Sequence, residues 1–118
     1  MLPGESFYIE GAKYRDGNGV SLDRKIAGSL FIQSAEKHFP QGMAWIALLS
    51  KGAITGFTED FDTYRKWESE LENNNNVNFI IERANNGDID AQYTLGVMYE
   101  EGCATPLDFK LSVHWYTK

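Results

Sequence analysis

Cysteine, histidine and proline are scarce in this chain, and its runs of apolar residues are short. The 118 residues include one cysteine, two histidines and three prolines. The single thiol, Cys103, cannot form an intramolecular disulfide, a CxxC redox pair or a four-ligand zinc site. No stretch approaches the roughly 18 apolar residues that a membrane span needs, and residues 1–6 lack the features of a secretion signal. We therefore expect a protein of a reducing compartment, the cytoplasm, without a membrane segment.

Positive charge is also in short supply. Eleven Lys and Arg stand against 17 Asp and Glu, which gives a formal net charge of −6. Because this is the wrong sign for holding a phosphate backbone, nucleic acid is not an expected partner. An acidic surface is better suited to basic protein surfaces.

Groups that could carry out catalysis do not gather in the sequence. His38 and His114 stand outside any HExxH or EF-hand spacing. Cys103 has no adjacent basic residue that would favour its thiolate form. We therefore expect no catalytic residue, no cofactor and no metal ion, and no enzymatic activity.

What the chain does contain is an internal repeat. With 42% hydrophobic and 14% aromatic residues it can fold, and its length allows one compact domain or a short stack of repeats. Identities recur at an offset of 85 residues: Gly11, Tyr14, Gly17, Leu22, Asp23 and Lys25 match Gly96, Tyr99, Gly102, Leu107, Asp108 and Lys110. A blurred third copy lies between them, in which Asp60, Phe61 and Trp67 match Asp108, Phe109 and Trp115.

Each copy has the pattern of a helical hairpin. Ala91, Leu95 and Tyr99 recur at spacings of four residues, which places them on one face of a first helix. Gly102 and Pro106 indicate a turn, and Asp108 is placed to cap a second helix, as Asp23 is in the first copy. Between the second and third copies we expect an insertion, in which residues 73–76, all asparagine, form a solvated loop before a further helix over 77–84.

This pattern resembles the Sel-one-like repeat (SLR) family, a relative of the tetratricopeptide repeats. The last copy carries it from Ala91 through Leu95-Gly96 and Tyr99 to Trp115. The first copy carries it at the following positions: Gly11, Tyr14, Gly17, Gly19, Val20, Asp23, Ala27, Ser34 and Ala35. The copies also depart from the family pattern, because Glu10 stands where Leu95 stands later and Cys103-Ala104 replaces the Asn18-Gly19 form of the turn.

We therefore predict an all-α protein, an α/α superhelix (solenoid) of about three helix-turn-helix hairpins in a single domain, 1–118. Repeat 1 covers about 5–39, a degenerate repeat 2 about 40–72 with the insertion 73–86, and a truncated repeat 3 about 87–118. The resemblance implies a non-enzymatic protein-protein interaction module, an adaptor or scaffold that holds a peptide or protein on its concave face. An alternative is a small acidic immunity protein, an inhibitor that masks a basic toxin or enzyme.

Four large side chains are candidates for contact with a partner. Tyr8, Trp45, Tyr93 and Met98 fall on the first helices of the hairpins, off the positions that the repeat uses for packing. First helices generally line the concave side of a hairpin stack, and exposed aromatic and methionine side chains anchor many interfaces. The other interpretation is that these residues complete the core. We further expect Trp115 and Tyr116 to lie uncovered on the last hairpin, where a second copy, a partner or further chain would pair with them.

Overall fold

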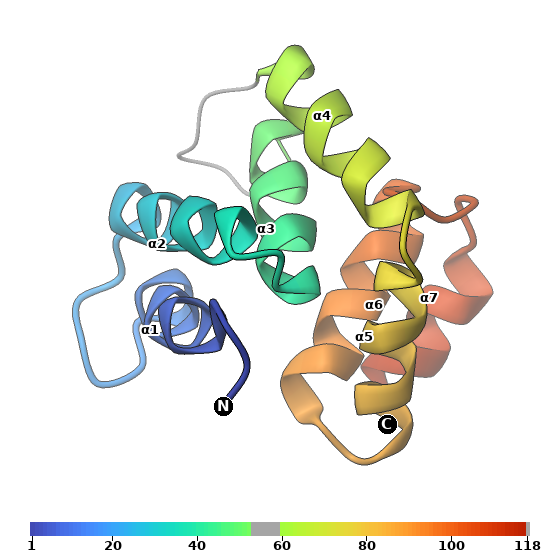
Figure 1. Cartoon of the computed structure of the whole chain (residues 1–118). Helices are drawn as coiled ribbons and strands as arrows, with labels where there is room; N and C mark the ends of the chain where they lie inside the picture. The colour runs from blue at the N-terminus through green and yellow to red at the C-terminus, as the bar shows by residue number, and fades with distance from the viewer. Residues whose placement is uncertain (53–59, 118) are drawn as a thin grey trace.

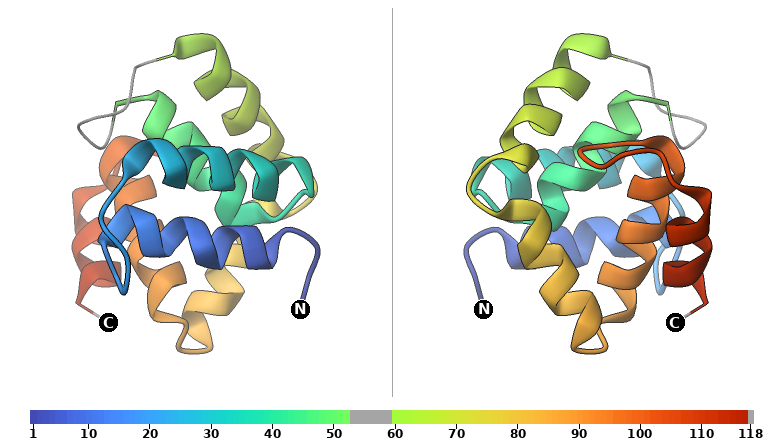
Figure 2. Two further views of the ribbon diagram at one scale, coloured as in Figure 1. Left: turned by 90° about the vertical axis from the view of Figure 1, so that its left-hand side faces the viewer. Right: turned by 90° about the vertical axis from the view of Figure 1, so that its right-hand side faces the viewer.

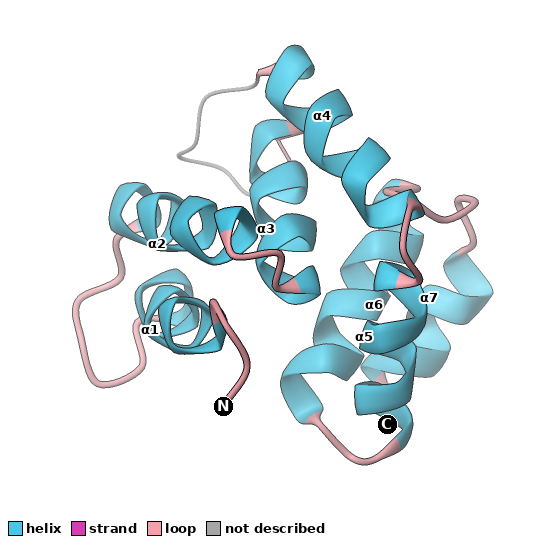
Figure 3. Ribbon diagram, viewed as in Figure 1, coloured by secondary structure: helices cyan, strands magenta, loops and turns pink. Residues whose placement is uncertain are grey.

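The computed structural model describes residues 1–52 and 60–117, and these residues form seven α-helices and no strand (Figures 1 and 3). The helices are α1 (Glu5–Asp16), α2 (Arg24–Glu36), α3 (Pro40–Ser50), α4 (Phe61–Glu72), α5 (Asn76–Asn85), α6 (Ile89–Glu101) and α7 (Phe109–Tyr116). The all-helical prediction is confirmed. The predicted repeat boundaries stay a proposal, and 53–59 of the second repeat and Lys118 of the third lie outside the described residues.

The helices pair as hairpins around a central helix. α1 packs against α2, α3 against α4, and α6 against α7, and α2 and α3 join the first two pairs (Figure 1). Figure 2 shows α1 and α2 side by side on one flank of the molecule and α6 and α7 on the opposite flank. All eleven residues of α3 are buried. This helix is apolar around most of its circumference rather than along one stripe, which is the composition of a core helix.

The turns of the first and last hairpins have the same geometry. Asp23 accepts hydrogen bonds from two backbone N–H groups at the start of α2, and Asp108 accepts one from Leu111 at the start of α7. The carbonyl oxygens of Tyr14 and Tyr99 each accept a bond of 3.0 Å from the N–H of these caps. The predicted helix caps are therefore confirmed, and the two tyrosines have equivalent roles.

Glycine ends α1 and α6 in the same way. Gly17 and Gly102 adopt left-handed φ angles of 70° and 68°, which glycine reaches without the clash that a Cβ atom causes. Two residues later Gly19 and Ala104 are also left-handed, with φ of 79° and 56°. The loop path is therefore retained in the last hairpin although its sequence differs.

The inserted segment forms a loop and then a helix. Asn73 ends α4, and Asn74 and Asn75 are exposed with left-handed φ angles. The helix that follows, α5, packs against α3, α4 and α6, so it fills space between the second and third hairpins. No helix in the described residues is both long and apolar enough to cross a membrane.

The turn before α7 is fastened to α4 through Glu68. The carboxylate accepts hydrogen bonds from the Tyr64 hydroxyl at 2.7 Å and the Ala104 backbone N–H at 3.0 Å, and it pairs with Arg65 at 2.9 Å. Burial acts to raise the pKa of Glu68, but these hydrogen bonds and the charge of Arg65 outweigh it, so the pKa is lowered. The folded protein therefore favours the ionised carboxylate.

Replacing Glu68 by glutamine is expected to reduce the dependence of stability on pH. A lowered pKa stabilises the fold above the ordinary Glu value of 4.5, and this contribution is lost as the pH falls through the folded value. We expect E68Q to cost about 1 kcal/mol at pH 7 and progressively less below about pH 4.5, because hydrogen bonds to a charged group are the stronger ones. Urea unfolding across this pH range measures the difference.

Glu72→Gln is the matched control, because Glu72 is exposed on the same helix. A gap between wild-type and E68Q stability that stays constant from neutral to acid pH would contradict the role of Glu68.

Candidate functional site

The first helix of the first hairpin meets the first helix of the last hairpin through side chains alone. No Cα atom of α1 lies within 8 Å of one in α6. Arg15, which lies on α1, crosses this gap to pair with Asp90 on α6 at 2.9 Å. Tyr8 and Arg15 are seven residues apart on one helix, which is two turns and therefore the same face.

Arg15 is the centre of a buried polar network. Its side chain is 3% exposed, and it pairs with Asp16 at 2.8 Å as well as with Asp90. It also donates a hydrogen bond of 3.2 Å to the Tyr8 hydroxyl, which in turn donates to the Asp90 carboxylate. The Trp45 indole lies 4.5 Å from the guanidinium carbon, close enough for a cation–π contact.

The network favours the charged arginine and the neutral tyrosine. Burial acts to lower the pKa of Arg15, but the hydrogen bond with Asp16 and the negative charge of Asp90 outweigh it, so the pKa is raised. Burial, together with the charge of Asp90, raises the pKa of Tyr8. At neutral pH Arg15 is therefore positively charged, and Tyr8 is a neutral hydrogen-bond donor.

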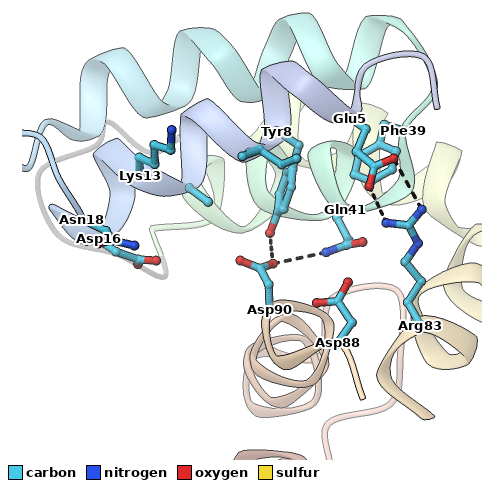
Figure 4. Close-up of a pocket in the computed structure, with 12 residues that line it drawn as sticks. Glu5, Tyr8, Lys13, Asp16, Asn18, Phe39, Gln41, Arg83, Asp88 and Asp90 are labelled. Carbon is cyan, nitrogen blue, oxygen red and sulfur yellow. Dashed lines mark hydrogen bonds and ion pairs between the residues drawn. The ribbon is translucent and has the colours of Figure 1, made fainter. Parts of the chain in front are cut away.

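A cavity of about 360 Å³ opens beside this network, between α1 and the starts of α3 and α6 (Figure 4). Tyr8 and Phe39 form part of its wall, and Arg83 closes the side toward α5 through an ion pair with Glu5 of 2.7 Å. Gln41 contributes its amide, which donates a 3.2 Å hydrogen bond to Asp90. The cavity combines an apolar wall with converging polar groups, which is the usual composition of a binding site.

The structure corrects the predicted exposure of the candidate contact residues. Tyr8, Trp45 and Met98 are buried, at 3%, 0% and 0% exposure, so the interpretation that they complete the core describes these three. Phe31 and Phe39 pack on Tyr8, and Phe31 and Tyr93 both stack on Trp45. Tyr93 is 40% exposed. Partner binding by this set stays a prediction, and Tyr93 is the member that has accessible surface.

The sequence pattern did not indicate the charged residues of the site. Asp88 and Asp90 begin α6, where carboxylates are expected to stabilise the helix start, and nothing in their spacing distinguishes this role from binding. Arg15 has no counterpart in the last repeat, where Glu100 stands at the matching position. The available signal was the seven-residue spacing of Tyr8 and Arg15, which places an aromatic and a cationic residue on one helix face.

The only thiol of the chain is buried beside α4. Burial, together with the negative charge of Glu68, raises the pKa of Cys103 to about 12. The thiol is therefore protonated at neutral pH, which is not its nucleophilic form. In the described part of the chain no three His, Cys, Asp or Glu side chains are grouped as metal ligands.

Two solved structures are similar to this one. The first is a Sel1 repeat protein from Oxalobacter formigenes, with a TM-score of 0.52 and 21% identity over 95% of this chain and 39% of that chain. The second is a protective antigen of uropathogenic Escherichia coli that displays an SLR fold, with a TM-score of 0.53 and 23% identity over 97% of this chain and 22% of that one. This chain thus spans well under half the length of each. No family model and no curated protein matches it. The structural likeness confirms the SLR fold that the repeat pattern predicts.

Proposed function

We propose that this chain, which has the SLR fold, is a non-enzymatic adaptor or scaffold that binds a peptide or protein on the concave side formed by its first helices. The SLR fold is generally a scaffold for protein-protein interaction. The observation that supports the proposal is the cavity between α1, α3 and α6, because it joins first helices from all three hairpins. The cytoplasmic location expected from the cysteine content belongs to the same proposal.

Affinity capture from the native host, followed by mass spectrometry, tests this function with two matched variants. Ile9 lines the cavity and is 41% exposed, whereas Ile32 lies on α2 outside the cavity and is 37% exposed. We expect Ile9→Asp to lose a protein that the wild type and Ile32→Asp both retain. A set of captured proteins that both variants retain equally would contradict binding on the concave side.

The alternative, an inhibitor of a basic toxin or enzyme, is favoured by the charge of the cavity. Four carboxylates line it against two cationic side chains, in a protein of net charge −6. Electrostatic attraction to one basic partner makes affinity fall steeply with salt. Calorimetry of the captured complex at low and high salt therefore separates the two functions, because the adaptor is expected to bind several peptides weakly and with little salt dependence.

We further propose that the last hairpin associates with a second copy through α7. Large apolar side chains lie exposed on and before this helix: Leu107, Phe109, Leu111, Val113 and Tyr116. Trp115, which the sequence predicts to be uncovered, is instead partly buried against the core. Burial of the exposed side chains between two copies would remove apolar surface from water. We expect the mean mass in sedimentation experiments to rise with protein concentration, and to stay at the monomer value in Phe109→Glu. A wild-type protein that remains strictly monomeric at high concentration would contradict this contact.

A further inference from the structure

The charged groups that line the cavity are mostly neutralised by partners within the chain. Glu5 pairs with Arg83. Asp16 and Asp90 share the guanidinium of Arg15. The remaining cation, Lys13, pairs at 3.0 Å with Glu10, which lies outside the cavity.

Asp88 is different, because no cation lies within ion-pair distance of it among the residues of 1–52 and 60–117. Within the described residues its carboxylate accepts a single hydrogen bond, from the backbone N–H of Ala91 at 3.1 Å, which caps α6. Figure 4 shows its carboxylate turned into the space between Asp90 and Arg83, below Gln41. The cavity therefore contains one carboxylate with unused capacity to accept hydrogen bonds.

Gln41 adds a second acceptor at the same place. Its side-chain amide nitrogen donates to Asp90, and this bond sets the orientation of the amide group, with the nitrogen toward Asp90. Its oxygen, Oε1, is buried and has no hydrogen-bond donor within the described residues, although Gln41 itself is only 2% exposed. Buried polar atoms are rarely left without a partner, so an unsatisfied acceptor in a cavity wall points to a donor that arrives with a ligand.

We propose that this cavity binds an arginine side chain of the protein partner. The inference rests on the proposed function, and it adds the chemistry of the group that is recognised. A guanidinium carries five N–H donors in a fixed plane and a positive charge, so it can donate to Asp88 and to Oε1 of Gln41 together. The aliphatic part of an arginine side chain fits against the apolar wall of Ile9, Ala12 and Phe39. The arginine supplies the positive charge that would pair with the Asp88 carboxylate. It also supplies a hydrogen-bond donor for Oε1 of Gln41.

The test uses a minimal probe, N-acetyl-arginine methylamide, and its neutral isostere, the citrulline compound. Amide resonances of the ¹⁵N-labelled protein are followed as each probe is added. We expect the arginine probe to shift resonances of residues that line the cavity, and the citrulline probe to leave them unchanged. Equal shifts with both probes, or shifts confined to residues outside the cavity, would overturn the proposal.

Asp88→Asn and Asp108→Asn form the matched pair of variants. Both aspartates cap a helix and both changes remove one negative charge, but only Asp88 lines the cavity. Asparagine caps a helix as well as aspartate does, and the amide spectrum itself reports whether the variant is folded. We expect D88N to weaken binding of the arginine probe at least about fivefold, because a charge-assisted hydrogen bond is lost, and D108N to bind as the wild type does. Equal affinities of D88N and D108N would contradict the role of Asp88.

The outcomes of this experiment and of the affinity capture separate the arginine inference from the proposed function. If Ile9→Asp loses a captured partner but the arginine probe does not bind, the concave side is an interaction surface and the arginine inference is wrong. If the probe binds and D88N weakens it, but no captured protein depends on Ile9, the arginine site stands and the proposed function is wrong.

Discussion

Replacing Arg15 by alanine is expected to lower the free energy of unfolding by about 2–4 kcal/mol, because it leaves the Asp90 carboxylate and the Tyr8 hydroxyl without their cationic partner. Removing one member of a fully buried ion pair costs about 3–5 kcal/mol. Asp90 keeps 29% of its side-chain surface exposed, so water offsets part of the loss. Since a small domain is stable by about 5–15 kcal/mol, this one side chain supports a large share of the total.

Urea unfolding of R15A beside Lys13→Ala measures this effect. Lys13 lies on the same helix, but its ion pair with Glu10 is exposed on both sides, so K13A is expected to change stability by less than about 0.5 kcal/mol. A double-mutant cycle separates the charge from the packing: Asp90→Asn is expected to cost less in R15A than in the wild type, because the partner of Asp90 is already gone. Additive losses in the cycle would contradict a stabilising interaction between Arg15 and Asp90.

Replacing Gly11 by alanine is expected to destabilise the fold more than the same change at Gly96, although the two positions are equivalent in the repeat. A Cβ atom at Gly11 would lie 2.8 Å from the Phe31 ring, and one at Gly96 would lie 2.4 Å from the Tyr116 ring. Both glycines thus let an aromatic side chain of the second helix lie directly on the first helix. Judged by these distances alone, alanine at Gly96 would cost more stability than alanine at Gly11, because the contact at Gly96 is the shorter one.

G11A is expected to cost more stability than G96A because the two aromatic rings differ in the space into which they can move when a Cβ atom displaces them. Phe31 is fully buried between Tyr8 and Trp45, so the ring has no free space into which to move. Tyr116 is 42% exposed in the last turn of α7, so its ring can rotate into water. Overpacking costs about 1–3 kcal/mol, and alanine gains up to about 1 kcal/mol over glycine in a helix. We expect a net loss of about 2 kcal/mol for G11A and less than about 1 kcal/mol for G96A.

Thermal or urea unfolding of the two variants measures this difference directly. The replacement is the same chemically and lies at the same position of the repeat, so each variant is the control for the other. A larger loss in G96A than in G11A would mean that the surroundings of Phe31 adapt more easily than those of Tyr116.

Much of the secondary structure could be predicted from the sequence because the determining interactions are local. Asp23 and Asp108 cap helices, and Gly17 ends one, through atoms a few residues away. Glu10 is exposed in the first repeat, at the position where Leu95 is buried in the last one, as the polarity of the two side chains requires. Because these signals recur at an offset of 85 residues, they indicated the same hairpin at both ends of the chain.

The site could be predicted only in part, because burial depends on segments that are distant in sequence. Tyr8 and Tyr93 occupy equivalent repeat positions, yet Phe31, Phe39 and Asp90 enclose the first while the second keeps accessible surface. A repeat pattern states which residues are alike, but not which neighbouring hairpin covers them.

The sequence by itself determined that the chain forms helical hairpins and which aspartates cap and which glycines end several of their helices, since caps and turns act over a few residues. Only the tertiary structure decided that Arg15 meets Asp90, 75 positions along the chain, and that Asp88 and Gln41 line one cavity. The physical reason is that charge pairing and burial depend on distance in space, and this distance is set only when the hairpins pack together.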